Sequence, residues 1–256
     1  MPERPRVYRT RGVVLKRGDL GEADKVLTIY TPHFGKLRAV AKGVRRPSSR
    51  LGGHVEEFSH SEMLLAKGRE LDVVTQAQTV DSFRGMREDM WRTTHGYYVV
   101  ELVECFTEER VEEPRLFDLL VSTLRYLADC PDLFTAVRFF EVQMLGVVGY
   151  RPELSRCLVC RGEIKPEDNF FSAAMGGVLC PACGYGEVRA RPISLNALKV
   201  LRHLQRLESP PPAGLRLDPA TRREVEGITR SQIEHLLERQ LKSTAFLERL
   251  RLEELT

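Results

Sequence analysis

The segment Lys36-Leu37-Arg38-Ala39-Val40-Ala41-Lys42 alternates between two kinds of side chain, and a period of two is that of a β-strand. Lys36, Arg38 and Lys42 share one face of this strand with Val40, and Leu37, Ala39 and Ala41 share the other. Four more strands are predicted within the first 80 residues, at 7–15, 26–31, 62–66 and 72–79. Five short strands predict a small closed barrel, because closure removes unpaired sheet edges. An OB-fold is the leading prediction, and the pattern alone leaves an SH3-like barrel open.

Beyond residue 80 the apolar residues recur with the period of helices. One predicted helix follows Pro114, a second follows Pro131, and further helices begin after Ser194 and Asp218. The sequence therefore predicts an α+β protein, with a barrel domain over residues 1–80 and a helical domain over residues 81–256.

Two close pairs of cysteines interrupt the helical pattern. Cys157, Cys160, Cys180 and Cys183 form a C-x2-C-x19-C-x2-C pattern, which falls within the spacing of zinc sites. Each pair can aim two thiolates at one point, and two pairs complete a tetrahedron. We therefore predict a zinc ribbon inserted at about residues 153–190, with one structural Zn²⁺ per chain. A redox-active pair or accidental spacing is the alternative.

Positive charge is concentrated at the start of the chain. The first 50 residues carry 13 Lys and Arg against 4 Asp and Glu, whereas the whole chain has a net charge of only +3. Six of these cations lie within fifteen residues with no acid between them, and such a cluster predicts binding to a nucleic-acid phosphate backbone. They are Lys36, Arg38, Lys42, Arg45, Arg46 and Arg50. The alternative is a solvated strand edge protected by charge.

Motifs of enzymes are missing from the sequence. It holds no glycine-rich phosphate loop, no G-x-S-x-G motif and no paired histidines with metal-ligand spacing. His54-Val55-Glu56 resembles half of a zinc-deaminase motif, but about a hundred residues separate it from cysteines that already form a complete ligand set. We expect no enzymatic activity. With no stretch of 18 apolar residues and no apolar N-terminal segment, we also expect a cytoplasmic protein with no membrane partner.

Several short motifs follow one another in a characteristic order. They are Gly21-Glu22-Ala23-Asp24-Lys25, Thr31-Pro32-His33-Phe34-Gly35-Lys36, Ala41-Lys42-Gly43-Val44-Arg45-Arg46 with Ser49-Arg50-Leu51, Leu145-Gly146-Val147-Val148-Gly149-Tyr150 ahead of the first cysteine pair, and Leu241-Lys242-Ser243. In this order and spacing, over nearly its whole length, the chain resembles the RecO family of bacterial recombination mediators.

The resemblance implies an N-terminal OB-fold, a helical C-terminal domain and an inserted zinc ribbon. It implies binding of single- and double-stranded DNA, annealing of complementary strands, and partnership with RecR and possibly RecF. It also implies remodelling of single-strand-binding protein so that RecA loads onto DNA, at the bacterial nucleoid. By motif, the six cations are the DNA-contact candidates. Arg138, ahead of Phe139-Phe140-Glu141, matches a family position that recognises the acidic, aromatic-ended tail of single-strand-binding protein.

Two other functions remain open from the residues alone. A zinc-ribbon RNA-binding or ribosome-associated factor would need the same positive charge. A structural adaptor could use its basic face to bind an acidic protein. Annealing of complementary strands would distinguish a recombination mediator from the RNA-binding factor. DNA affinity at moderate salt would exclude the structural adaptor.

Overall fold

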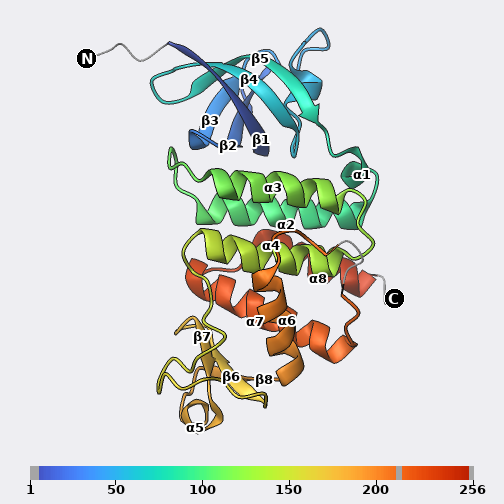
Figure 1. Ribbon diagram of the computed structural model, residues 1–256. Coiled ribbons are helices and arrows are strands. Elements are labelled where there is room, and N and C mark those ends of the chain that lie inside the picture. Colours follow the sequence, from blue (N-terminus) through green and yellow to red (C-terminus); the bar gives the residue numbers. More distant parts are fainter. Residues whose placement is uncertain (1–5, 212–214, 254–256) are drawn as a thin grey trace, which may run out of the picture. The chain divides into compact units, whose positions relative to one another are not determined.

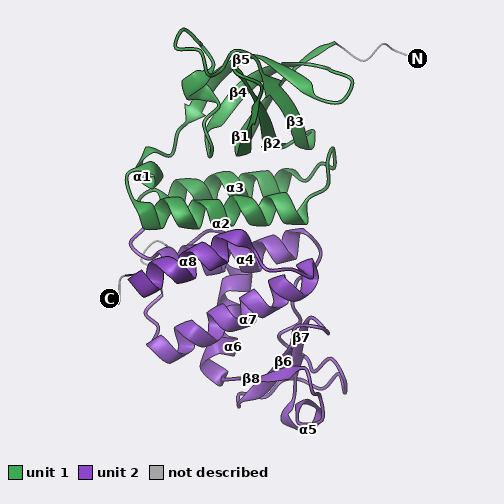
Figure 2. Ribbon diagram, turned by 180° about the vertical axis from the view of Figure 1, so that it is seen from behind, with its two compact units in different colours: residues 1–129 green, residues 130–256 purple. Residues whose placement is uncertain are grey.

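The computed structural model describes residues 6–211 and 215–253 and divides into two compact units, residues 1–129 and 130–256 (Figures 1 and 2). The first unit holds a β-barrel and three helices. The second holds four longer helices, with a small three-stranded sheet and a one-turn helix inserted among them. The α+β prediction is confirmed.

Five strands close into a barrel in the order β1-β2-β3-β5-β4. Neighbouring strands run antiparallel except β3 and β5, which run parallel. This five-stranded arrangement is consistent with the predicted OB-fold. The strands are β1 (Val7–Leu20), β2 (Asp24–Thr31), β3 (Gly35–Ala41), β4 (His60–Ala66) and β5 (Asp72–Asp81), with a short 3-10 turn, η1 (Gly52–His54), between β3 and β4.

The first strand is longer than the sequence predicts. The sequence predicts that this strand ends at residue 15, but β1 continues to Leu20, and Gly21, with φ of +60°, lies in the turn that follows. A register shift between Val14 and Lys16 bends the strand. The bend lets the first half of β1 pair with β4 and the second half with β2, so one strand closes the barrel.

The barrel core follows the predicted alternation. Leu37, Ala39 and Ala41 of β3 are fully buried, together with Leu27 and Ile29 of β2. Alternate residues of a strand point away from this core, so the period of two places Arg38 of β3 on the outer surface of the barrel, where it is exposed.

Three helices complete the first unit: α1 (Arg84–Arg87), α2 (Met90–Phe106) and α3 (Pro114–Leu127). Asp89 caps α2 by accepting a hydrogen bond from the Arg92 backbone N–H, and Pro114 occupies the first turn of α3 as predicted. The barrel strands end at Asp81, but these helices share a compact unit with the barrel. The domain boundary at residues 80/81 therefore stays a prediction.

The second unit is built around α4 (Leu133–Val147), whose Phe139 and Phe140 are almost fully buried. The other helices are α6 (Leu195–Arg206), α7 (Pro219–Leu237) and α8 (Lys242–Glu253), and Ser194 and Asp218 cap α6 and α7 as expected. The inserted elements are β6 (Asn169–Ser172), β7 (Gly177–Leu179), α5 (Pro181–Gly184) and β8 (Ala190–Ile193). Among the described residues, none of the helices combines the length and apolar character that a membrane span requires.

Gly35 begins β3 where the loop between α2 and α3 comes closest to the barrel. Its φ is +59°, and a Cβ there would lie 2.1 Å from the carbonyl oxygen of Val111. We predict that Gly35→Ala lowers the free energy of unfolding by about 2–4 kcal/mol, because left-handed strain and a backbone clash add. Urea unfolding measures the change. Gly53→Ala is the control, since a Cβ there meets nothing within 4 Å. Equal stability of the two variants would contradict the close approach.

Candidate nucleic-acid interface and metal site

Five of the six predicted cations are exposed on β3 and the residues that follow it, and we call these five together the cationic face: Arg38, Lys42, Arg45, Arg46 and Arg50. Arg38 lies opposite Thr28 of β2, which lies opposite Lys16 of β1. Directly opposed residues share one face of a sheet. Lys16, which the sequence analysis did not select, therefore extends the row of Arg38 across the barrel.

Hydrogen bonds hold the loop after β3 in place. The backbone N–H of Gly43 donates to Asp24 Oδ1 (2.7 Å), and that of Arg45 donates to the carbonyl oxygen of Ala23 (3.0 Å). Val44 between them is buried. The loop is thus anchored to the turn between β1 and β2, and its arginines project from a fixed backbone.

An acidic side chain from β1 reaches this surface. Asp19 Oδ2 lies 3.9 Å from Arg45 Nη1, and Asp19 also accepts a hydrogen bond from Lys25 at 2.8 Å. The run of residues 36–50 is acid-free in sequence, but its surroundings in the fold are not. Sequence spacing gave no sign of this, because the acid comes from a separate strand.

Lys36 has a different environment from the other five cations. Its ammonium donates two hydrogen bonds of 2.6 Å, to the carbonyl oxygens of Glu104 and Thr107 at the C-terminal end of α2. Burial lowers the pKa of Lys36, and the negative field of Glu104 and neighbouring acids opposes that change. A cation suits this position, since the last carbonyl groups of a helix have no partner within it. Lys36 thus joins the barrel to α2 and is not directed to solvent.

A groove of about 430 Å³ runs along the barrel beside Arg38. Its lining combines both signs of charge: Lys16, Gly18, Asp19, Val26, Thr28, Lys36, Arg38, Glu104 and Glu109. Lys16 Nζ lies 3.6 Å from Glu104 Oε1. The cationic face is thus bordered at this groove by the acids Asp19, Glu104 and Glu109. No motif in the sequence indicates that border.

The second unit brings the four predicted cysteine ligands together. All four sulfur atoms lie within 4.8 Å of one another, and Cys160 Sγ is 3.8 Å from Cys180 Sγ. Tetrahedral Zn²⁺ with bonds of about 2.3 Å places its sulfur ligands about 3.8 Å apart. The donor set therefore fits a metal of this kind, and four thiolates leave no position for a substrate.

Local backbone geometry positions each cysteine pair. The N–H of Arg161, which has φ of +62°, donates to the Cys157 carbonyl and folds the first pair back on itself. Cys180 precedes α5, and its carbonyl accepts from the N–H of Cys183. The three strands β7-β6-β8 lie beside these turns. Within this insertion β6 pairs with β7 as an antiparallel hairpin, and β8 pairs with the other edge of β6.

The thiols differ in their tendency to ionise. Burial opposes ionisation of Cys157, but hydrogen bonds from the backbone at Cys180, Cys160 and Val159 lower its pKa to about 6. Side-chain hydrogen bonding to Cys180, with burial, raises the pKa of Cys183 to about 12. One thiolate therefore makes the next harder to form, and a bound cation would allow all four to ionise.

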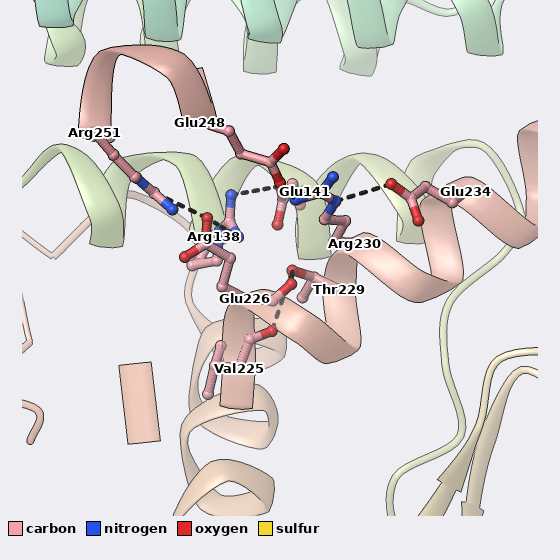
Figure 3. A network of polar contacts seen from close by, with 9 residues as sticks. All are labelled: Arg138, Glu141, Val225, Glu226, Thr229, Arg230, Glu234, Glu248 and Arg251. Carbon is pink, nitrogen blue, oxygen red and sulfur yellow. Dashed lines mark hydrogen bonds and ion pairs between the residues drawn. The ribbon is translucent and has the colours of Figure 1, made fainter. Parts of the chain in front are cut away.

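Arg138 lies within a network of charged side chains from α4, α7 and α8 (Figure 3). It pairs with Glu141 at 2.7 Å and Glu226 at 3.9 Å, and its side chain is only 8% exposed. Burial opposes ionisation of Glu226, but Arg138 and Arg251 hold its pKa below the usual value. Arg138 is thus in a structural network, and its role in binding a partner stays a prediction.

Comparison with known proteins agrees with the fold. The model of the RecO N-terminal region, "Recombination protein O N terminal", matches residues 6–83, and "Recombination protein O C terminal" matches residues 87–245. The chain belongs to the RecO family. A DNA repair protein RecO of Roseiflexus sp. (strain RS-1) is 42% identical over 97% of this chain and 87% of its own length.

Other relatives cover the chain as completely. A DNA repair protein RecO of Desulforudis audaxviator is 39% identical over 95% of this chain and 97% of its own length. A DNA repair protein RecO of Dehalococcoides mccartyi is 35% identical over 96% of this chain and 97% of its own length. The similarity therefore spans both units and the cysteine-containing insertion.

The metal site leads to a prediction of composition. We expect one zinc per chain in freshly purified protein, and we expect Cys157→Ser to remove it and to open residues 153–190 to limited proteolysis while the barrel stays protected. The reason is that metal binding supplies on the order of 10 kcal/mol to such a small insertion. Elemental analysis measures the metal. Cys105→Ser is the control and should retain it; a wild-type protein without zinc would contradict the assignment.

The network around Arg138 leads to a prediction of stability. Arg138→Met should lower the free energy of unfolding by about 3–5 kcal/mol, because it leaves the buried Glu141 carboxylate without the guanidinium that neutralises it. Adding Glu141→Leu should restore most of the loss, since a buried pair can be replaced by apolar side chains at little cost. Thermal and urea unfolding report both. If the double variant were less stable than the single variant, the pair would not be the source of the effect.

Proposed function

We propose that this chain is a non-enzymatic, DNA-binding recombination mediator that acts in DNA repair. The single observation that carries the proposal is the cationic face, five exposed basic side chains on a fixed strand and loop of a barrel. Membership of a family whose relatives are named DNA repair proteins supports it. OB-fold barrels commonly bind single strands on such surfaces through their phosphates.

The proposed mechanism is electrostatic and involves no bond making. Two complementary strands repel each other, and neutralising their phosphates on one surface reduces that repulsion. Holding both strands near one surface also raises their effective concentration, so that pairing becomes faster. We propose strand annealing on this basis. The metal in the second unit, proposed as Zn²⁺, would stabilise the cysteine-containing insertion and take no part in annealing.

The proposed partners follow the family. The chain would bind single- and double-stranded DNA. Together with RecR and possibly RecF, it would help RecA to load onto DNA coated by single-strand-binding protein, at the nucleoid in the cytoplasm. We place contact with the acidic tail of that protein at the second unit, near Arg138. Because Arg138 is buried and ion-paired, its surroundings would have to rearrange before it met a peptide carboxylate.

Replacing Arg45 and Arg46 by Ala tests the cationic face. If the wild type neutralises about four phosphates, its affinity for single-stranded DNA should fall with salt with a log–log slope near −3. The double variant should bind all sequences more weakly, with the slope flatter by about 1 or slightly more, because each contact contributes about 0.7. Fluorescence anisotropy across a salt series measures both quantities, and annealing should slow in parallel.

The matched control removes two exposed arginines of the same unit elsewhere. Arg84 in α1 pairs with Glu88, and Arg115 begins α3. Arg84→Ala with Arg115→Ala makes the same change in net charge and should leave the slope within error of the wild type. If the wild type and Arg45→Ala/Arg46→Ala bound DNA with equal affinities and slopes, the cationic face would be only a solvated strand edge and not a DNA-binding surface.

A further inference from the structure

We propose that Glu104 and Glu109 form an acidic wall that ends the path of a single strand across the barrel, by keeping Lys16 from phosphate binding. This inference rests on the proposed function and specifies the extent of its binding surface. It assigns a role to two acids and one lysine that none of the sequence motifs includes.

The groove beside Arg38 places the three residues together. Lys16 from β1, Glu104 from α2 and Glu109 from the loop after α2 all line it. Lys16 lies in the same cross-strand row as Arg38, with Thr28 between them. Adjacent strands are about 4.8 Å apart, so a strand of DNA on Arg38 could reach Lys16 across one neighbouring strand.

The ion pair with Glu104 occupies Lys16. The two charged groups are 3.6 Å apart, and the Lys16 side chain is 61% exposed. An exposed pair of this kind is weak and would not by itself exclude a phosphate from Lys16. A phosphate would have to displace one carboxylate and approach a second at Glu109. Over a screening length of about 10 Å at 0.1 M salt, both acids repel it.

The wall is fixed in position by contacts to the barrel. The backbone N–H of Arg110 donates to the Lys36 carbonyl at 2.8 Å, and its guanidinium donates to Asp72 at 2.7 Å. Gly35 packs against the backbone of Val111. Glu109 therefore cannot move away from the groove with its loop when a strand arrives.

A strand bound along the cationic face would thus stop short of Lys16. The limit keeps the number of phosphate contacts small and the affinity moderate. Annealing needs such a limit, because a strand must leave the protein once it has paired, and every additional phosphate contact slows dissociation.

The test is the double variant Glu104→Gln/Glu109→Gln, assayed on single-stranded DNA across a salt series. Glutamine keeps the shape of each side chain, and Lys36 binds the backbone carbonyl of Glu104, so the contact between β3 and α2 is retained. With Lys16 released, we expect the log–log slope to steepen by about 0.7. The gain in affinity over the wild type should therefore be about eightfold greater at 50 mM salt than at 1 M.

Lys16→Ala completes the comparison. In the wild type it should change affinity less than twofold, whereas in the Gln double variant it should remove the gain. Glu70→Gln with Glu112→Gln is the charge-matched control, since both acids are exposed and neither lines the groove. It should leave the slope unchanged.

The outcomes separate the wall from the proposed function. If the wild type binds with a slope near −3 and the Gln double variant has the same slope and affinity, the proposed acidic wall is wrong. The proposal that the cationic face binds DNA is then unaffected. An equal gain in the control, or a gain that survives Lys16→Ala, also overturns the wall, because net charge alone would explain it. A wild type that does not bind DNA overturns both.

Discussion

The contact of Lys36 with the C-terminal end of α2 is the constraint on which the first unit depends. One ammonium group satisfies two helix carbonyl oxygens at 2.6 Å, directly beside the position where Gly35 lets the loop backbone approach. A buried cluster supports the same loop, with Asp72 accepting hydrogen bonds from Tyr8 and Arg110. Burial and the bond to Asp72 raise the pKa of Tyr8 to about 12. Barrel and helices are therefore held as one unit.

This constraint determines what the outer surface can do. Because Lys36 is fixed to α2, Arg38 lies at one edge of the cationic face. The loop with Arg45 and Arg46 lies at the opposite edge. The acids that follow α2 lie against the edge at Arg38. Different contacts stabilise the second unit. Four thiol groups converge within its small insertion, and an ion-pair network links its helices (Figure 3).

Local patterns in the sequence were sufficient for most of the fold. Alternation in residues 36–42 identified β3 and its buried face, and the spacing of Cys157, Cys160, Cys180 and Cys183 identified the residues that converge. The features that the sequence did not reveal share a cause: they depend on contacts between distant segments. A bulge carries β1 through an apparent turn, a helix end recruits Lys36, and the partners of Arg138 include Glu226 on another helix.

The central claim is that the cationic face is where DNA lies. Photo-crosslinking of a 5-iodouracil-substituted single strand, followed by mass spectrometry of the tryptic peptides, tests it most directly. The account predicts that crosslinked peptides come from β2, β3 and the loop that follows β3, with none from β4 and β5. Crosslinks confined to peptides of residues 130–253 would contradict it and would move the DNA surface to the second unit.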